Sequence, residues 1–240
     1  MAVSYTTQGF VFKKEDRADS DRLFSVFTKD FGRLQVMGKA IRKITSKLRG
    51  GMDIFHISEI EFIQGKHKKT LIDATPVKNF KGIFESPEKL LLAHRISEVI
   101  DIFIKGQQRD ESIFLFCEEI FTILHCDQSK KQLLIFTFFF WNFISHLGYG
   151  PELANCAACS QKLQPERLYF SYQEGGVVCP ACAMIKKNQT PIHPDTVKVL
   201  RLMLKKNWGT IVRIKMTTGL QDQLKSISEN YYRYLLSSHT

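Results

Sequence analysis

The chain has 240 residues, and 44% of them are hydrophobic, enough to fill the core of one large domain or of two to three small ones. Its 34 Lys and Arg outnumber its 24 Asp and Glu, so the formal charge is +10 at pH 7, which favours polyanionic partners. The composition therefore indicates a folded, soluble protein.

The sequence argues against secretion and against insertion into a membrane. The N-terminal sequence MAVSYTTQGF has neither a basic region nor an apolar one, so we expect no secretion and a cytoplasmic, reducing compartment. The most apolar run, LLIFTFFFWNFI at residues 133–144, is shorter than the roughly 20 residues that a membrane span needs. We expect a buried helix there and no membrane partner.

Residues 1–82 predict a β-barrel. Five segments rich in β-branched and aromatic residues predict strands: VSYTTQGFVFKK, DRLFSVFT, GRLQVMGKAI, DIFHISEIEFIQG and KKTLIDATPV. Turn residues separate them at Asp30 to Gly32, at Gly50-Gly51 and at Gly65. Five short strands with such turns are typical of a small barrel.

Helical periodicity begins after residue 82. Ser86 and Pro87 predict an N-cap and first turn, and residues 110–126 and 129–148 predict two further helices, the last one buried on nearly every side. Residues 193–208 and 217–238 return to helical periodicity. We therefore predict an α+β fold with a barrel at 1–82, a helical domain at 83–150 and 191–240, and a cysteine-rich insert at 151–190.

The insert contains two Cys-x-x-Cys pairs separated by residues 160–178. Such pairs on a ribbon can bring four thiolates to one Zn²⁺, with ligands Cys156, Cys159, Cys179 and Cys182. Residues RLYFSY and GVV are expected to pair as the ribbon. The alternative is a redox pair or a disulfide, but a thioredoxin-like dithiol stands at a helix start after a strand in a βαβ unit, and we expect neither pair to have that setting.

Four Cys ligands would close the coordination sphere, so we expect one structural zinc per chain and no zinc hydrolysis. Cys117 and Cys126 lie on an apolar helix and are expected to be core residues. The chain has no phosphate-binding loop, no H-E-x-x-H and no G-x-S-x-G motif, and we expect no catalytic residues.

A cationic stretch lies between Asp30 and Asp53, where the sequence has no acidic residue. It contains Arg33, Lys39, Arg42, Lys43, Lys47 and Arg49. An ordinary solvated surface is the alternative, but uncompensated charge of this length favours phosphate contact.

In a barrel of the oligonucleotide/oligosaccharide-binding (OB) type, a single strand would lie on cations and stack on aromatic residues. Phe10, Phe12, Phe31 and Phe55 are available for stacking, although each is more often a core residue. A second basic region could hold another strand; it contains Lys186, Lys187, Lys198, Arg201, Lys205, Lys206, Arg213 and Lys215.

Residues 9–55 closely resemble the opening of the RecO family of bacterial DNA repair proteins. The matching features are Gly9 to Val11, the S-D-R-L of residues 20–23, Thr28, Gly32 to Leu34 and the basic series 39–49 ending in L-R-G. A looser likeness continues to the G-Y-x-P-x-L-x-x-C approach to Cys156, at residues 148–156. The resemblance covers nearly the whole chain.

The resemblance implies an N-terminal OB domain, a helical domain and a small zinc-binding element. RecO-like proteins are non-enzymatic recombination mediators of the cytoplasm and nucleoid. They bind single- and double-stranded DNA, anneal complementary strands, and act with RecR, often with RecF, to load RecA onto strands covered by single-strand DNA-binding protein, whose tail they contact.

By motif position, the resemblance gives the phosphate-contacting role to Lys39, Arg42, Lys43, Lys47 and Arg49. The remaining alternative is a zinc-ribbon adaptor whose basic surface binds acidic protein tails.

Overall fold

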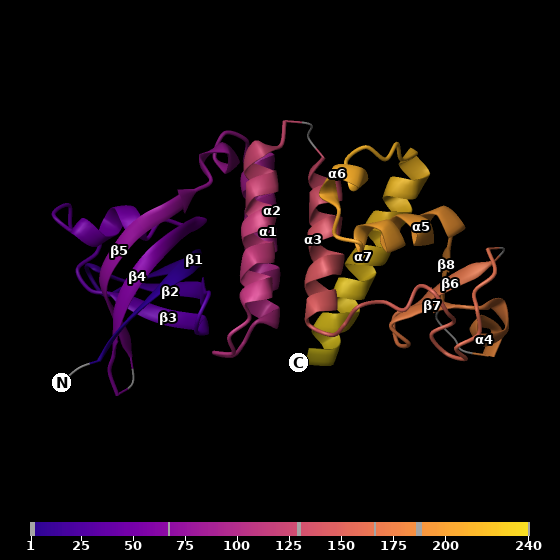
Figure 1. Ribbon diagram of the computed structural model, residues 1–240, viewed down its shortest axis with the longest axis horizontal. Helices are drawn as coiled ribbons and strands as arrows, with labels where there is room; N and C mark the ends of the chain where they lie inside the picture. The colour runs from indigo at the N-terminus through magenta and orange to yellow at the C-terminus, as the bar shows by residue number, and fades with distance from the viewer. Residues whose placement is uncertain (1–2, 67, 129–130, 166, 186–188, 240) are drawn as a thin grey trace. The chain divides into compact units, whose positions relative to one another are not determined.

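A computed structural model describes the chain apart from residues 1–2, 67, 129–130, 166, 186–188 and 240 (Figure 1). Contacts between Cα atoms divide it into two compact units, Met1–Gln132 and Leu133–Thr240, which are taken in turn. The predicted α+β class, with a barrel, helices and a cysteine-rich insert, is confirmed. The domain boundaries predicted after residues 82, 150 and 190 stay a proposal.

The first unit begins with a closed barrel in the order β1-β2-β3-β5-β4. Its strands are β1 (Ser4–Arg17), β2 (Asp21–Thr28), β3 (Gly32–Gly38), β4 (His56–Gln64) and β5 (Lys69–Asn79). Only β3 and β5 pair in parallel among these neighbours. This is OB topology, and each strand falls on one of the predicted segments.

Alternation of side chains decides which residues fill the barrel. On β3, Leu34 and Val36 lie in the barrel core, while Arg33, Gln35 and Met37 occupy the outer face. Phe24 and Val26 of β2 also enter this core. The outer faces of β2 and β3 are therefore available for charged side chains or for other elements.

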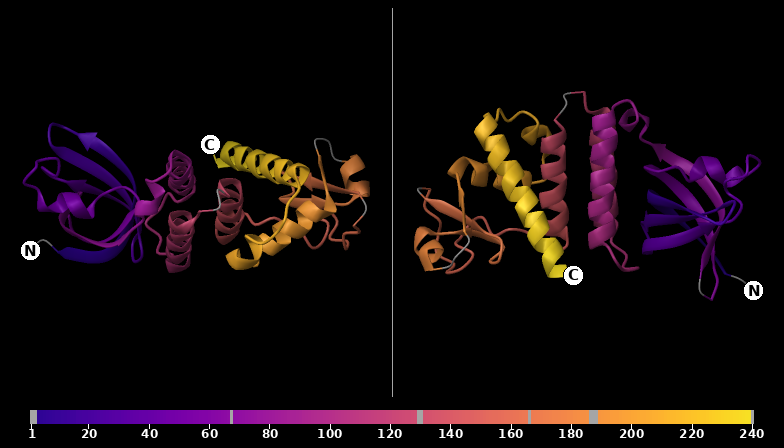
Figure 2. Two further views of the ribbon diagram at one scale, coloured as in Figure 1. Left: turned by 90° about the horizontal axis from the view of Figure 1, so that it is seen from above. Right: turned by 180° about the vertical axis from the view of Figure 1, so that it is seen from behind.

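Two helices cover part of the barrel's outer surface. Helix α1 (Pro87–Phe103) begins at Ser86, whose hydroxyl accepts from the amide of Lys89, and α2 (Glu111–Cys126) begins with the same arrangement at Asp110. The two helices run side by side next to the barrel (Figures 1 and 2). The short 3-10 helix η2 (Lys81–Ile83) leads into α1.

Phe121 of α2 is the centre of the contact between barrel and helices. Its ring centroid lies 4.4 Å from that of Phe10, 5.5 Å from Phe55 and 5.9 Å from Phe80. Phe12 is buried as well. Phe10, Phe12 and Phe55 are thus core residues and are closed to nucleobases.

The predicted cysteine environments differ between the two helical thiols. Cys117 is buried on α2, and this burial raises the pKa of its thiol. Cys126 ends α2 and is exposed, so its prediction as a core residue is wrong.

The second unit is built on α3 (Gln132–His146) and α7 (Thr218–His239), which lie side by side (Figure 2). Residues 134–144 of α3 are all buried, as its apolar run predicts. Trp141 stacks on Tyr231 with centroids 5.2 Å apart, and its Nε1 donates to Ser228 Oγ at 2.9 Å. Helices α5 (Pro194–Met203) and α6 (Trp208–Ile211) complete the helical part.

A small sheet in the order β7-β6-β8 packs against these helices. It contains β6 (Leu168–Ser171), β7 (Gly176–Val178) and β8 (Thr190–Ile192), and the β6–β7 pair is the predicted ribbon. Phe170 of β6 lies 5.9 Å from Trp141 and 5.6 Å from Tyr231 between ring centroids. The ribbon therefore shares its core with α3 and α7. No helix within the described part of the chain has the length and apolar content of a membrane span.

Candidate metal centre and nucleic-acid interface

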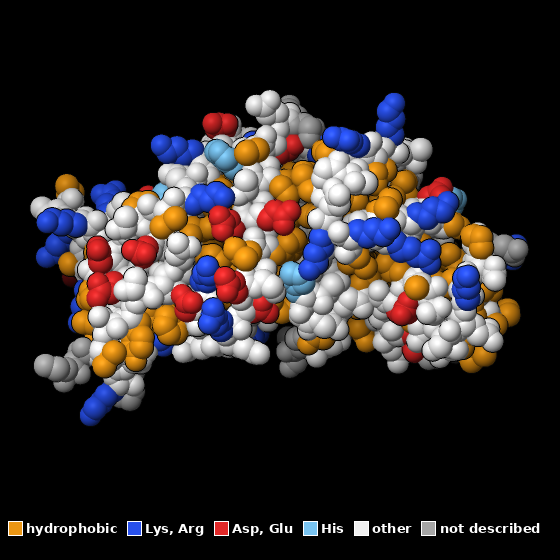
Figure 3. Space-filling model, viewed as in Figure 1, with side chains coloured by type: hydrophobic (Ala, Val, Ile, Leu, Met, Phe, Trp, Pro, Cys, Tyr) orange, Lys and Arg blue, Asp and Glu red, His pale blue; other side chains and the backbone are white. Residues whose placement is uncertain are grey.

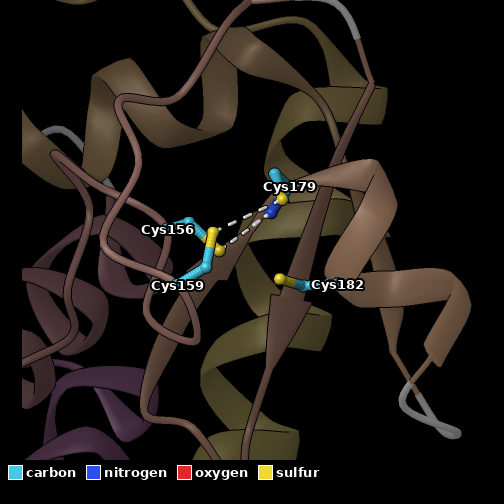
Figure 4. A group of neighbouring side chains, drawn as sticks. All are labelled: Cys156, Cys159, Cys179 and Cys182. Atoms are coloured by element: carbon cyan, nitrogen blue, oxygen red, sulfur yellow. Dashed lines mark hydrogen bonds between the residues drawn. The ribbon is translucent and has the colours of Figure 1, made fainter.

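The two Cys-x-x-Cys pairs meet as the spacing predicts. The ligand sulfur atoms of Cys156, Cys159, Cys179 and Cys182 all lie within 4.8 Å of one another, and the side chains point toward a common centre (Figure 4). The Sγ atoms of Cys159 and Cys179 are 3.9 Å apart. Thiolates around a tetrahedral Zn²⁺ have nearly this separation, because each Zn–S bond is about 2.3 Å long.

Backbone amides shape the first knuckle. The amide of Ala157 donates to the carbonyl of Val177 at 2.8 Å, which attaches the knuckle to β7. The carboxylate of Glu152 accepts from the amides of Ala154 and Asn155, and these hydrogen bonds lower its pKa. Glu152 thereby fixes the chain that leads to Cys156.

The thiols themselves differ in acidity. Burial opposes ionisation of Cys156. The backbone amides of Cys179, Cys159 and Ala158 favour the thiolate more strongly, and together they lower the pKa of Cys156 to about 6. The amide of Cys179 donates to Cys156 Sγ at 3.3 Å. Hydrogen bonding with the neighbouring Cys159 and Cys179 raises the pKa of Cys182 to about 12. The Cys156 thiol thus ionises more easily than an ordinary thiol, and a bound metal cation would favour deprotonation of the other three thiols.

The donor set fits a soft divalent metal ion such as zinc, since four sulfur atoms converge without a carboxylate or imidazole among them. The second Cys-x-x-Cys pair has part of the thioredoxin-like setting. Cys179 follows β7 and directly precedes helix α4 (Pro180–Ile185), so this pair does begin a helix. The strands are antiparallel, however, and the second pair of sulfurs completes a metal cage that a redox dithiol does not need.

The predicted basic loop lies in the connection between β3 and β4, which contains the 3-10 helix η1 (Lys47–Gly51). Lys39, Lys43, Lys47 and Arg49 are exposed and form no ion pair with any described residue. Arg42 is also exposed, and its Nη1 lies 3.6 Å from Asp16 Oδ2. The loop is thus largely uncompensated, as predicted.

Arg33 has surroundings that the sequence reasoning did not foresee. It forms an ion pair with Asp101, and its Nη1 donates to the carbonyls of Asp101 and Ile104, each at 3.3 Å, at the C-terminal end of α1. Gly32 beside it has a φ of +63°, and a Cβ there would lie 2.4 Å from the backbone oxygen of Gln108. Arg33 therefore joins the barrel to α1, and we assign it this structural role.

A larger basic groove, of about 770 Å³, lies over the outer faces of β2 and β3. We call it the barrel groove; its lining is Arg17, Ala18, Asp21, Leu23, Arg33, Gln35, Met37, Lys68, Lys69, Lys105 and Gln107. It is bounded by the β1–β2 turn and by the β4–β5 turn. These are the elements that OB domains use for oligonucleotides.

Three groove cations come from segments that sequence reasoning passed over. Lys68 and Lys69 follow the β4–β5 turn, and Lys105 lies between α1 and α2; none of the three has an ion-pair partner among the described residues. Lys68 and Lys69 belong to the short basic run Lys66-His67-Lys68-Lys69, which the sequence reasoning treated only as a hairpin turn, and Lys105 is isolated in the sequence. The outward alternation of Arg33, Gln35 and Met37 on β3 was the signal that could have located this face.

In the second basic region three cations have partners within the protein, and one of these partners is a carboxylate. Lys198 Nζ lies 2.9 Å from Asp195 Oδ1, Arg201 donates to the carbonyl of Leu153, and Lys206 contacts His146. Lys205, Arg213 and Lys215 are exposed and have no ion pair with a described residue, while Lys186 and Lys187 lie outside the described residues. Lys and Arg side chains are visible over α5 and α6 in Figure 3.

Barrel topology, helices and four converging cysteines together define an OB-fold protein with a helical region and a metal-binding element. The family described as "Recombination protein O N terminal" matches residues 1–80, and "Recombination protein O C terminal" matches residues 85–240. The chain therefore belongs to the RecO family, whose members are recombination mediators and generally non-enzymatic.

Several curated relatives carry the name DNA repair protein RecO. One from Dehalococcoides mccartyi is 28% identical over 232 residues, which are 97% of this chain and 90% of that protein. One from Desulfitobacterium hafniense is 30% identical over 179 residues, 74% of this chain and 64% of that protein. One from Caldanaerobacter subterraneus is 27% identical over 228 residues, covering 95% and 91%. Family membership supports a role in DNA repair and recombination.

Proposed function

We propose that this protein is a non-enzymatic mediator of recombinational DNA repair that holds DNA strands on cationic surfaces. The observation that carries the proposal is the barrel groove, where Lys68, Lys69 and Lys105 have no ion-pair partner among the described residues and lie on the face that OB domains use for nucleic acid. Phosphates bound there would release counterions, which supplies affinity without base specificity. The exposed loop cations Lys39, Lys43, Lys47 and Arg49 would add phosphate contacts.

Strand annealing follows from the same property. Two complementary strands held near each other at high effective concentration pair faster than free strands, and no covalent step is needed. By analogy with the RecO family, we place this activity in the cytoplasm. There the protein would act with RecR and RecF to load RecA onto DNA covered by single-strand DNA-binding protein. The tail of that protein would be a further contact.

The metal centre is proposed to hold one structural zinc ion. Cys156, Cys159, Cys179 and Cys182 would provide all four ligands, and zinc would supply only cross-linking of the ribbon, since no position remains for water. Because Phe170 of the ribbon packs on Trp141 and Tyr231, this cross-link would also stabilise the helical part of the second unit.

A second function as a protein adaptor is favoured by one observation near the metal centre. Met184 and Ile185 on α4 are 83% and 82% exposed, which is unusual for apolar side chains on a helix. A partner protein could cover them. The adaptor alternative, in which the basic surface binds acidic protein tails, predicts weak binding to oligonucleotides.

Fluorescence anisotropy with a single-stranded oligonucleotide at several salt concentrations tests the proposal. Exchanging Lys68 and Lys69 for Gln should weaken binding and reduce the slope of log K against log salt by about 1.4, or about 0.7 for each lost phosphate contact. The control variant, Lys162→Gln with Lys225→Gln, removes two exposed charges outside both basic regions and should bind like the wild type. Equal loss in both variants would reject the groove as the binding site.

A further inference from the structure

A second hollow, of about 310 Å³, lies at the barrel end between the β1–β2 hairpin and the β3–β4 connection. We call it the hairpin pocket; its lining is Lys14, Arg22, Phe24, Ile41, Arg42, Arg49, Met52 and Asp53. Two of its cations, Arg42 and Arg49, belong to the predicted basic loop, whereas Lys14 and Arg22 come from β1 and β2 and were not part of the predicted site; none of the four lines the barrel groove.

The hairpin pocket and the barrel groove use opposite faces of the same hairpin. Lys14 pairs with Phe24 and Asp16 with Arg22 across β1 and β2, so these side chains share one face. Leu23 and the Arg17–Asp21 pair alternate with them and belong to the other face, where they line the groove. The groove and the pocket therefore lie on the two faces of one hairpin, whose turn is at residues 18–20.

Charge in the pocket is organised by two carboxylates. Asp16 accepts from Arg22 Nε at 2.6 Å and lies 3.6 Å from Arg42 Nη1, so it holds two guanidinium groups beside each other. Asp53 lies 3.6 Å from Lys14 Nζ. Arg49 has no ion pair with any residue in the described ranges. Four cations against two carboxylates leave a local charge of +2.

The floor of the pocket is closed by buried apolar side chains, and this limits the kind of phosphate that it can hold. Phe24, Ile41 and Met52 are 1%, 2% and 2% exposed and belong to the barrel core, so a polymer cannot continue through the floor. A phosphodiester within a strand continues on both sides and carries one negative charge. A phosphate monoester at a strand end stops in the pocket and carries a charge of about −1.5 to −2 at pH 7.

We propose that the hairpin pocket binds the terminal phosphate of a DNA strand whose body lies in the barrel groove. Among the described residues that line the pocket, Arg49 is the cation without an ion pair, and Lys14 adds an ammonium group that Asp53 partly neutralises. Arg22 and Arg42, which Asp16 holds together, supply fixed guanidinium donors of the kind that recognise phosphate oxygens. This assignment rests on the proposed function, and it gives the protein a preference for strand ends.

Anisotropy titrations with the full chain and one oligonucleotide test the assignment. The oligonucleotide is prepared with a 5′-phosphate, with a 3′-phosphate, with hydroxyl groups at both ends, and with hydroxyl ends and one additional nucleotide. We expect one phosphorylated form to bind about tenfold more tightly than the hydroxyl form, a difference of about 1.4 kcal/mol. The extra nucleotide adds an internal phosphate and should change affinity much less.

Two matched variants locate the effect. Arg49→Gln removes a pocket cation, whereas Lys47→Gln removes an exposed cation from the same 3-10 helix that does not line the pocket. The preference for a phosphorylated end should fall to about twofold or less in Arg49→Gln and persist in Lys47→Gln. If both variants keep it or both lose it equally, the pocket is not the site.

The remaining outcomes separate the two proposals. If the hydroxyl form binds well and terminal phosphates add nothing, the pocket assignment is wrong while the groove proposal stands. If no oligonucleotide form binds, the proposed function itself fails. Inorganic phosphate, tested alone at matched ionic strength, should not reproduce the affinity of the strand end; thermal stabilisation by phosphate without any end preference would identify a free-ion site and overturn the assignment.

Discussion

At the scale of single residues, the cations of this chain divide into those that hold the fold and those that face solvent. Arg33 was predicted to contact phosphate but is only 19% exposed and binds Asp101 together with two carbonyls at the end of α1. Lys39, Lys43, Lys47 and Arg49 are exposed and unpaired among the described residues, and their contact with phosphate stays a prediction. A charge run in the sequence cannot separate these cases, because the partner of Arg33 lies 68 positions away.

Exchanging Arg33 for Gln should lower the free energy of unfolding by about 1.5–3 kcal/mol, because charged hydrogen bonds in a mostly buried site are lost and Asp101 remains. Chemical denaturation of the protein, followed by the loss of its secondary structure, measures this change. Lys43→Gln removes the same charge from an exposed position and should shift stability by less than about 0.5 kcal/mol. If the Arg33 and Lys43 variants had the same free energy of unfolding, Arg33 would have no structural role of this kind.

At the scale of elements, the sequence predicted the pieces whose signals are local. Alternation located the five strands, Ser86 and Asp110 located the helix starts, and the apolar run located the buried α3. Strand β8 was missed, because three residues with a central proline carry no alternation that could indicate it. The barrel groove was missed for a different reason: its cations come from separate turns and meet only after the barrel closes.

Metal binding by the four cysteines of the ribbon can be tested directly. Purified protein should contain about one zinc ion per chain, and Cys156→Ser should lose it, with a lower midpoint of thermal unfolding, because the ribbon shares its aromatic core with α3 and α7. Cys126→Ser, which changes an exposed cysteine outside the cluster, should keep both metal and stability. Wild-type protein purified without chelator that holds no metal and has oxidised cysteines would favour the disulfide alternative.

At the scale of the whole molecule, the net charge of +10 is distributed unevenly. The visible face of the barrel in Figure 3 carries acidic side chains among its basic ones, and Glu61 and Asp73 lie directly opposite each other on β4 and β5. Among the described residues, cations without an ion pair gather in the barrel groove and the β3–β4 connection, and others stand singly elsewhere, as at Lys162 and Lys225. The two gathered sets are the surfaces on which a polyanion could meet several cations at once.

Annealing of complementary oligonucleotides, followed by quenching between labelled strands, tests this account most directly. The wild-type protein should accelerate pairing strongly at low salt and lose the effect as salt rises, while Lys68→Gln with Lys69→Gln should approach the uncatalysed rate and Lys162→Gln with Lys225→Gln should not. A wild-type protein that leaves the annealing rate unchanged, or a groove variant that anneals as fast as the wild type, would contradict the account.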